Sequence, residues 1–203
     1  MSEFLKLIIL FSSSYILGAI PFAFIFTRLF SKKNILEIGW KKASTSNVMK
    51  NVGVLPGVLT FVFDVLKGFV VVFLAKEFGF CFVAQAMAGF FVVLGHNYSM
   101  FLNFKGGRGI ATLLGAIFAF NYLIGIMLLI PVLISAIVWT AGIGTVVSYV
   151  LGIIFSKDGL LLLFLLCLTP IVLKRVLPFE KKYFVNRLLF DQDNVPCLRV
   201  KKK

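Results

Sequence analysis

The chain contains uncharged stretches that are far longer than the hydrophobic elements of water-soluble domains. Residues 109–156 form a run of 48 residues without Asp, Glu, Lys or Arg, and residues 7–27 form another of 21. About 20 apolar residues are enough for a helix to cross the hydrocarbon core of a bilayer. Charged residues make up only 14% of the chain and the mean hydropathy is +1.02, whereas about a quarter of an average soluble domain is charged. These features predict an all-α integral membrane protein.

The length favours a single transmembrane domain over residues 1–203, without room for a separate soluble domain. The first apolar run could also begin a signal peptide. However, Lys6 is the only early cation and no small-x-small cleavage site follows, so we expect a retained helix with a kink at Pro21. No metal site, disulfide or cofactor is expected, because no metal or redox spacing links Cys81, Cys167 and Cys197.

The charge of the chain is strongly positive, with 21 basic against eight acidic residues and a net charge of +13. In a chain this apolar, clustered Lys and Arg indicate the cytoplasmic side of a membrane, beside anionic lipid, rather than a nucleic-acid partner. The clusters predict that three hydrophilic segments face the cytoplasm, namely the loops 31–51 and 95–108 and the basic tail 174–203.

These three segments restrict the number of membrane crossings. One apolar run precedes the first segment and two lie between the first and the second. The number of crossings between residues 109 and 173 must then be even, with breaks expected at Pro131 and at Ala141–Gly144. Two crossings would leave many residues of this segment outside the membrane, while four crossings fit only if each helix has roughly 15 residues. The total is therefore five or seven, with the N-terminus outside and the C-terminus in the cytoplasm.

The second hydrophilic segment ends in three glycines and two cations directly before an apolar run. Glycine allows successive backbone N–H groups to point toward one common centre. The N-terminus of the following helix contributes the positive end of the helix dipole to the same place. Such a loop can bind phosphate, although its spacing is not that of a P-loop. A flexible basic turn is an equally good interpretation from the residues alone. The loop consists of Lys105, Gly106, Gly107, Arg108 and Gly109.

Three further polar residues stand out in apolar surroundings. His96 is the only histidine in the chain, and it could cap a helix end or act as a base or hydrogen-bond donor near bound phosphate. Asp64 and Lys67 lie at positions i and i+3 of an apolar segment, and therefore on one face of a helix. Charges within a membrane are costly unless they are paired or functional. We expect a structural ion pair, with a role in a substrate site as the alternative.

The residues around this loop resemble a known family. Gly95–Asn97, Phe101, Phe104–Gly109 and Ala111–Thr112 resemble the signature G-H-x-x-P-x-F-x-x-F-K-G-G-K-G-x-A-T of the PlsY family of bacterial membrane glycerol-3-phosphate acyltransferases, with Ser99 in place of Pro and Arg108 in place of Lys. Further similarity, over nearly the whole chain, comes from Tyr15–Phe22, Asp64–Gly68 and Val147–Ser148.

The resemblance implies a seven-helix bundle in the bacterial cytoplasmic membrane, with a monomer as the expected state. It also implies transfer of a fatty acyl group from acyl phosphate to the 1-hydroxyl of glycerol 3-phosphate, which yields lysophosphatidic acid for phospholipid synthesis. An acyl phosphate is already activated, so the protein must mainly position and neutralise its substrates. On this resemblance, catalysis is assigned to His96, Asn47 and Ser46. Binding of substrate phosphate is assigned to the loop Lys105–Gly109, Lys50 and Ser148.

Two other family motifs are altered. Trp40 stands where the family has a small hydroxyl residue and is expected to narrow the polyol-phosphate site, while Lys50 replaces an Arg that would bind phosphate bidentately. In the C-terminal motif Arg187 is kept, but Lys181 and Phe184 replace His and Asn. A decayed homologue that only binds lipid or phosphate metabolites, or a small transporter, therefore remains an alternative to the enzyme.

Overall fold

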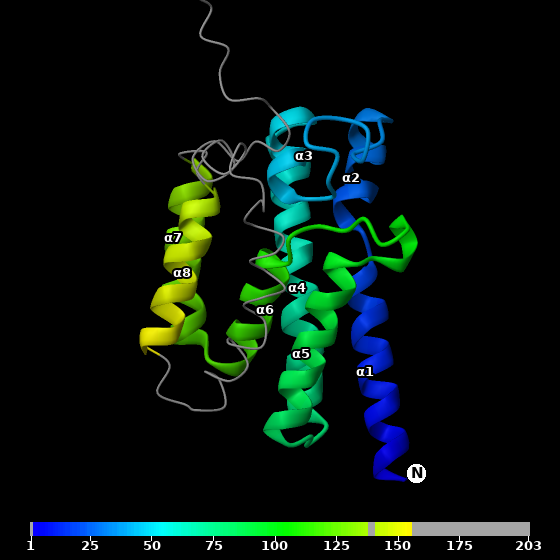
Figure 1. The fold of residues 1–203 in the computed structure, drawn as a ribbon, viewed down its shortest axis with the longest axis vertical. Helices are drawn as coiled ribbons and strands as arrows, with labels where there is room; N and C mark the ends of the chain where they lie inside the picture. Colours follow the sequence, from blue (N-terminus) through cyan, green and yellow to red (C-terminus); the bar gives the residue numbers. More distant parts are fainter. Residues whose placement is uncertain (1, 138–140, 156–203) are drawn as a thin grey trace, which may run out of the picture.

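The computed structural model describes residues 2–137 and 141–155, and within them the regular structure is entirely helical (Figure 1). Seven α-helices of ten residues or more are joined by a short α-helix, α3, and one turn of 3-10 helix, η1. In chain order the elements are α1 (Glu3–Ala19), α2 (Phe22–Ser31), α3 (Thr45–Asn51), α4 (Val54–Glu77), α5 (Phe82–Asn97), η1 (Met100–Leu102), α6 (Ile110–Phe120), α7 (Tyr122–Ile137) and α8 (Ala141–Phe155).

The break between α1 and α2 lies at the predicted kink. Proline lacks an N–H and keeps the residue before it out of helical geometry, and Ile20 accordingly has φ −58° and ψ 119°. The backbone carbonyls next to the break accept hydrogen bonds from other elements. Ser99 Oγ donates to the carbonyl of Ala19 at 2.5 Å, and Lys67 Nζ donates to that of Ile20 at 3.1 Å. The kink at Pro21 therefore fixes α4 and the segment after α5 to the first helix.

The long uncharged run folds into three short helices, α6, α7 and α8. The predicted break at Pro131 is wrong, because Pro131 lies inside α7, and the chain instead breaks at Asn121. The side-chain oxygen of Asn121 accepts hydrogen bonds from the N–H groups of Leu123 and Ile124, at 3.0 and 3.2 Å, and so caps α7. The described part of this run thus holds three helices, whereas the five-crossing arrangement needs only two crossings between residues 109 and 173. The apolar segment 159–173 and the tail 174–203 lie outside the described residues.

Glycines allow the longer helices to pack with their backbones in close contact. On α4 and α6, a Cβ on Gly68 would collide with the carbonyl oxygen of Thr112, and one on Gly115 with that of Val65. On α1 and α5, Gly18 contacts the carbonyl oxygen of Val92 in the same way. Small residues at helix contacts are typical of membrane proteins, in which dispersion and close packing hold helices together.

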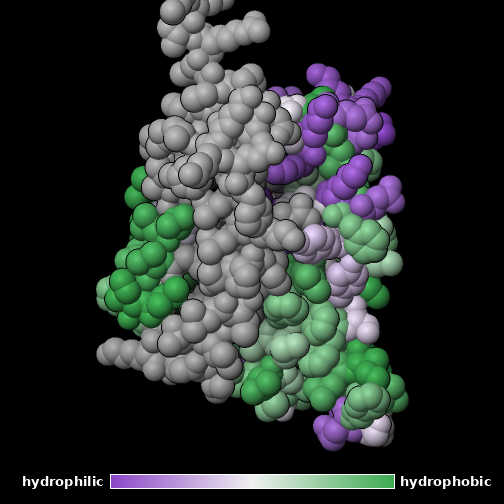
Figure 2. Space-filling view, in the orientation of Figure 1, coloured by the Kyte–Doolittle hydropathy of each residue, from purple (hydrophilic) through white to green (hydrophobic). Residues whose placement is uncertain are grey.

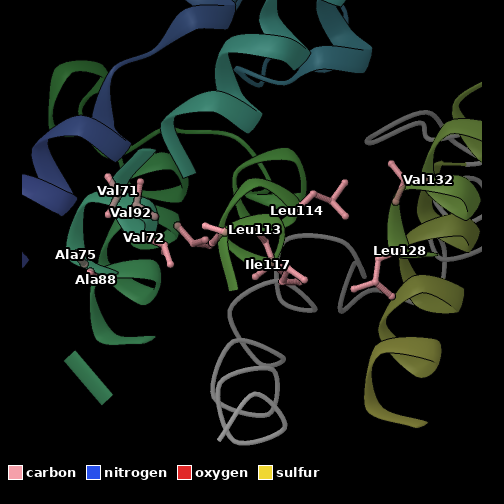
Figure 3. Close-up of a cluster of buried hydrophobic side chains, with 13 residues drawn as sticks. Val71, Val72, Ala75, Ala88, Val92, Leu113, Leu114, Ile117, Leu128 and Val132 are labelled. Atoms are coloured by element: carbon pink, nitrogen blue, oxygen red, sulfur yellow. The ribbon is translucent and has the colours of Figure 1, made fainter. Parts of the chain in front are cut away.

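A buried aliphatic core lies between these helices, and other aliphatic and aromatic side chains cover the outside. In Figure 3, Leu113 and Ile117 of α6 lie between Val72 on one side and Leu128 on the other. The surface left uncovered by grey atoms in Figure 2 is hydrophobic along the helices, and hydrophilic residues gather at the end where α2 and α3 lie. The turn after α5 comes to the same end (Figure 1). This distribution matches a helical bundle surrounded by lipid.

Candidate functional site

A pocket of about 250 Å³ lies between α3, α4, the end of α5 and the first turn of α6, with α7 and α8 on its far side. One part of its wall is polar, formed by Ser44, Thr45, Ser46, Lys50, Asp64, His96, Arg108, Gly109 and Thr145. The rest is apolar, formed by Met49, Val58, Phe61, Ile110, Ala111, Val132 and Leu133. The two kinds of wall suit a ligand that has an anionic group at one end and a hydrocarbon chain at the other.

The predicted ion pair is present at the base of the pocket. Lys67 Nζ lies 2.8 Å from Asp64 Oδ1, and both side chains are buried, at 5% and 2% exposure. His96 joins them, with its Nδ1 at 2.9 Å from Lys67 Nζ and 3.4 Å from Asp64 Oδ1. The ammonium group of Lys67 can only donate hydrogen bonds, so His96 Nδ1 is assigned as the acceptor and the hydrogen of the neutral imidazole is assigned to Nε2. The ion pair thus orients the imidazole of His96, which turns its Nε2 toward the glycine-rich loop.

The glycine-rich loop packs directly on His96. The N–H of Gly107 donates to the carbonyl of His96 at 3.1 Å, and a Cβ on Gly107 would collide with His96 Nε2. A Cβ on Gly106 would collide with the same carbonyl oxygen. The left-handed conformation of the loop lies at Gly109, where φ is +82° directly before α6. Gly106 and Gly107 are thus required for close approach to α5, and only Gly109 for its backbone conformation.

The two cations of the loop have different surroundings. Arg108 is 5% exposed and lines the pocket, together with Lys50 of α3. Lys105 is exposed, lies outside the pocket lining, and is joined to η1 by a backbone hydrogen bond to the carbonyl of Leu102 at 3.0 Å. Lys105 therefore does not line this pocket and its assignment to phosphate binding stays a prediction, whereas Arg108 and Lys50 both line the pocket.

Two of the predicted polar residues have structural roles. Asn47 is fully buried, and its side chain fixes the preceding loop by accepting from the N–H of Trp40 at 3.1 Å and donating to the carbonyl of Lys42 at 2.9 Å. Ser148 of α8 donates to the carbonyl of Leu128 in α7 at 2.8 Å and lies outside the pocket lining. Both side chains thus bond to backbone groups and their assignments to substrate stay predictions, whereas Ser46 lines the pocket.

The structure also changes the interpretation of Trp40 and adds residues that the motifs did not identify. The indole of Trp40 is 8% exposed and lies behind the cations, outside the pocket lining, so it does not narrow the pocket. Ser44 and Thr45 line the pocket beside Ser46. This run of hydroxyl residues at the start of a helix is a sequence signal that could have identified them as pocket residues. Thr145 of α8 and the apolar wall have no local sequence signal. The C-terminal motif around Arg187 lies outside the described residues.

Comparisons with known proteins identify the family of the chain. The sequence profile described as "Glycerol-3-phosphate acyltransferase" matches residues 8–179. A glycerol-3-phosphate acyltransferase of Lactococcus lactis subsp. lactis (strain IL1403) is 36% identical over 158 residues, which cover 78% of this chain and 73% of the relative. The Francisella philomiragia protein of the same name is 30% identical over 187 residues, covering 89% and 88%.

Solved structures support the fold. The crystal structure of PlsY, an integral membrane glycerol 3-phosphate acyltransferase, in its glycerol 3-phosphate form matches with a TM-score of 0.77 and 24% identity over 93% of this chain and 94% of that chain. Its lysophosphatidic acid form matches with a TM-score of 0.74. The fold is thus that of an integral membrane protein. Together with the profile and the sequence relatives, it confirms the resemblance found in the motifs: the chain belongs to the glycerol-3-phosphate acyltransferase family.

Proposed function

We propose that this protein transfers a fatty acyl group from acyl phosphate to the 1-hydroxyl of glycerol 3-phosphate and releases lysophosphatidic acid and phosphate. The observation that carries the proposal is the composition of the pocket, in which Lys50, Arg108 and His96 face the same space as an apolar wall. Both substrates have an anionic group, and one also carries a hydrocarbon chain. The relatives named above are glycerol-3-phosphate acyltransferases by name, and PlsY has been solved in a glycerol 3-phosphate form and in a lysophosphatidic acid form.

The chemistry needs positioning and charge stabilisation rather than a protein nucleophile. The hydroxyl oxygen of glycerol 3-phosphate attacks the carbonyl carbon of acyl phosphate, the bond from that carbon to the phosphate oxygen breaks, and the departing phosphate takes the hydroxyl proton. Arg108 and Lys50 neutralise phosphate charge, and the Nε2 hydrogen of His96 serves as a hydrogen-bond donor near the reacting phosphate. Holding the two substrates in this geometry lowers the barrier by removing the entropy cost of their encounter.

The site requires access from the compartment that supplies glycerol 3-phosphate. We place the N-terminus outside the bacterial cytoplasmic membrane, the loops 31–51 and 95–108 and the tail 174–203 in the cytoplasm, and the whole chain in one transmembrane domain of seven crossings. Support comes from the basic residues of these segments and from the common end of the molecule at which α2, α3 and the turn after α5 lie (Figure 1). We also propose that the protein acts as a monomer.

The direct test is product formation by purified protein. Acyl phosphate and glycerol 3-phosphate should give lysophosphatidic acid, while omission of either substrate should give none. Binding of glycerol 3-phosphate without product would indicate the decayed homologue. Uptake of solute by protein-containing vesicles without any acyl donor would indicate a transporter. Either result would contradict the proposal.

A further inference from the structure

Trp40 lies beneath both cations that line the pocket. Lys50 Nζ is 4.6 Å from the centroid of the Trp40 ring, and Arg108 Cζ is 6.0 Å from it. Lys50 belongs to α3 and Arg108 to the loop before α6, so the two cations reach the pocket from different elements. Trp40 itself is buried and forms no part of the pocket lining. It is therefore a contact shared by the two cations and is not itself part of the pocket wall.

The indole is held by a rigid part of the first loop. The backbone N–H of Trp40 donates to the side-chain oxygen of Asn47. The side-chain nitrogen of Asn47 donates to the carbonyls of Ile38 and Lys42, at 3.2 and 2.9 Å. The backbone on both sides of Trp40 is left-handed, with φ +54° at Gly39 and at Lys41. The loop that carries Trp40 is thus joined to α3 by hydrogen bonds that involve neither Lys50 nor Arg108.

An aromatic face attracts cations within about 6 Å of its centroid, and tryptophan does so most strongly. Two cations that line one small pocket repel each other. The shared ring offsets part of this repulsion, and it limits the conformations of the long Lys50 side chain, which otherwise loses much rotamer entropy on binding.

We propose that Trp40 is a positioning residue, which holds the Lys50 ammonium and the Arg108 guanidinium at the pocket so that they bind substrate phosphate together. The inference rests on the proposed function, since it takes glycerol 3-phosphate or acyl phosphate as the anion. It predicts that Trp40 acts on substrate binding through the electron density of its face, beyond filling space in the core. Its contribution therefore appears in KM, with a much smaller change in kcat.

Fluorinated tryptophan provides the test, because fluorine withdraws electron density from the ring and changes its shape little. The chain has two tryptophans, so a Trp139→Phe background leaves Trp40 as the labelled residue. Along the series from unsubstituted to tetrafluorinated indole, KM for glycerol 3-phosphate should rise progressively, by about five- to tenfold in total, with kcat within about twofold. In a Lys50→Met background the same series should have a distinctly smaller effect. A flat KM along the series would overturn the proposal.

Two further measurements separate this inference from the proposed function. Calorimetric titration with glycerol 3-phosphate gives its Kd along the same series without any turnover. Binding that weakens with fluorination in a protein that makes no lysophosphatidic acid would support the role of Trp40 and contradict acyl transfer. Product formation with a KM and a Kd that stay constant along the series would support acyl transfer and contradict the role of Trp40. Among ordinary variants, Trp40→Phe should retain more affinity than Trp40→Leu, and equal affinity of the two would also contradict the inference.

Discussion

Gly107 donates its backbone N–H to the carbonyl of His96 at 3.1 Å and has no room for a side chain, because a Cβ would collide with the imidazole. Gly107→Ala should therefore displace the histidine from the pocket and lower the rate of acyl transfer by at least about tenfold, the loss expected for one misplaced polar group. The measurement is the initial rate of purified protein. The control is Gly79→Ala in the turn between α4 and α5, where φ is +71° and a Cβ has nothing within 4 Å, so this variant strains the backbone without displacing a neighbour. Equal rates for the two variants would contradict this interpretation.

The two cations of the glycine-rich loop should differ in function. Arg108→Ala removes the buried cation of the pocket, so KM for glycerol 3-phosphate should rise by roughly ten- to a hundredfold, which is the usual loss for a charge-assisted hydrogen bond. Lys105→Ala removes an exposed cation of the same loop and should change KM by less than about threefold. Steady-state kinetics decide this. A larger effect of Lys105→Ala would place the phosphate outside the described pocket.

The buried pair Asp64–Lys67 should show strong coupling in stability. Asp64→Asn or Lys67→Met leaves one buried charge without its partner, which typically costs about 3–5 kcal/mol, whereas the double variant removes both charges and should be more stable than either single variant. Thermal unfolding in detergent measures this order. The exposed pair Glu3–Lys6 is the control, and Glu3→Gln should leave the midpoint nearly unchanged. Additive losses in the double variant would argue against a coupled pair.

The orientation in the membrane can be tested with cysteines at the two ends of the bundle. Cys81, in the turn between α4 and α5, is exposed and lies at the end opposite α3 (Figure 1). With Cys167 and Cys197 replaced by Ser, a membrane-impermeant thiol reagent should label Cys81 from outside intact cells. When Cys81 is also replaced, a Lys33→Cys variant in the basic loop should be labelled only after the cells are opened. The reverse pattern would invert the proposed topology.

Local sequence rules predicted those features that depend on neighbours in the chain. The kink at Pro21 follows from the missing N–H of proline, and the Asp64–Lys67 pair from helical spacing and the cost of isolated charge in lipid. The break at Asn121 was missed in favour of Pro131. A proline inside an apolar helix is tolerated in membrane proteins, and an asparagine side chain can cap a helix where no charge marks a turn.

The roles of individual polar residues were harder to predict, because they depend on distant partners. Asn47 looks like a substrate ligand in a family motif, yet its amide is used by carbonyls of the preceding loop. Ser148 likewise bonds to a carbonyl 20 positions earlier, on α7. Lys105 and Arg108 are three positions apart in one loop, and only the folded chain shows which of them is buried. Motif spacing identified the loop but not the directions of its side chains.

The central claim is that acyl transfer takes place in the pocket between α3, α4 and α6, and reversible blocking of the pocket tests it most directly. Met49 is half-buried and lines the pocket, so Met49→Cys in a chain without its three native cysteines places one thiol there. The measurement is the rate of lysophosphatidic acid formation before and after modification with a methanethiosulfonate reagent. We predict loss of most of the rate, slower modification in the presence of glycerol 3-phosphate, and recovery on reduction. An unchanged rate after complete modification would contradict the assignment of catalysis to this pocket.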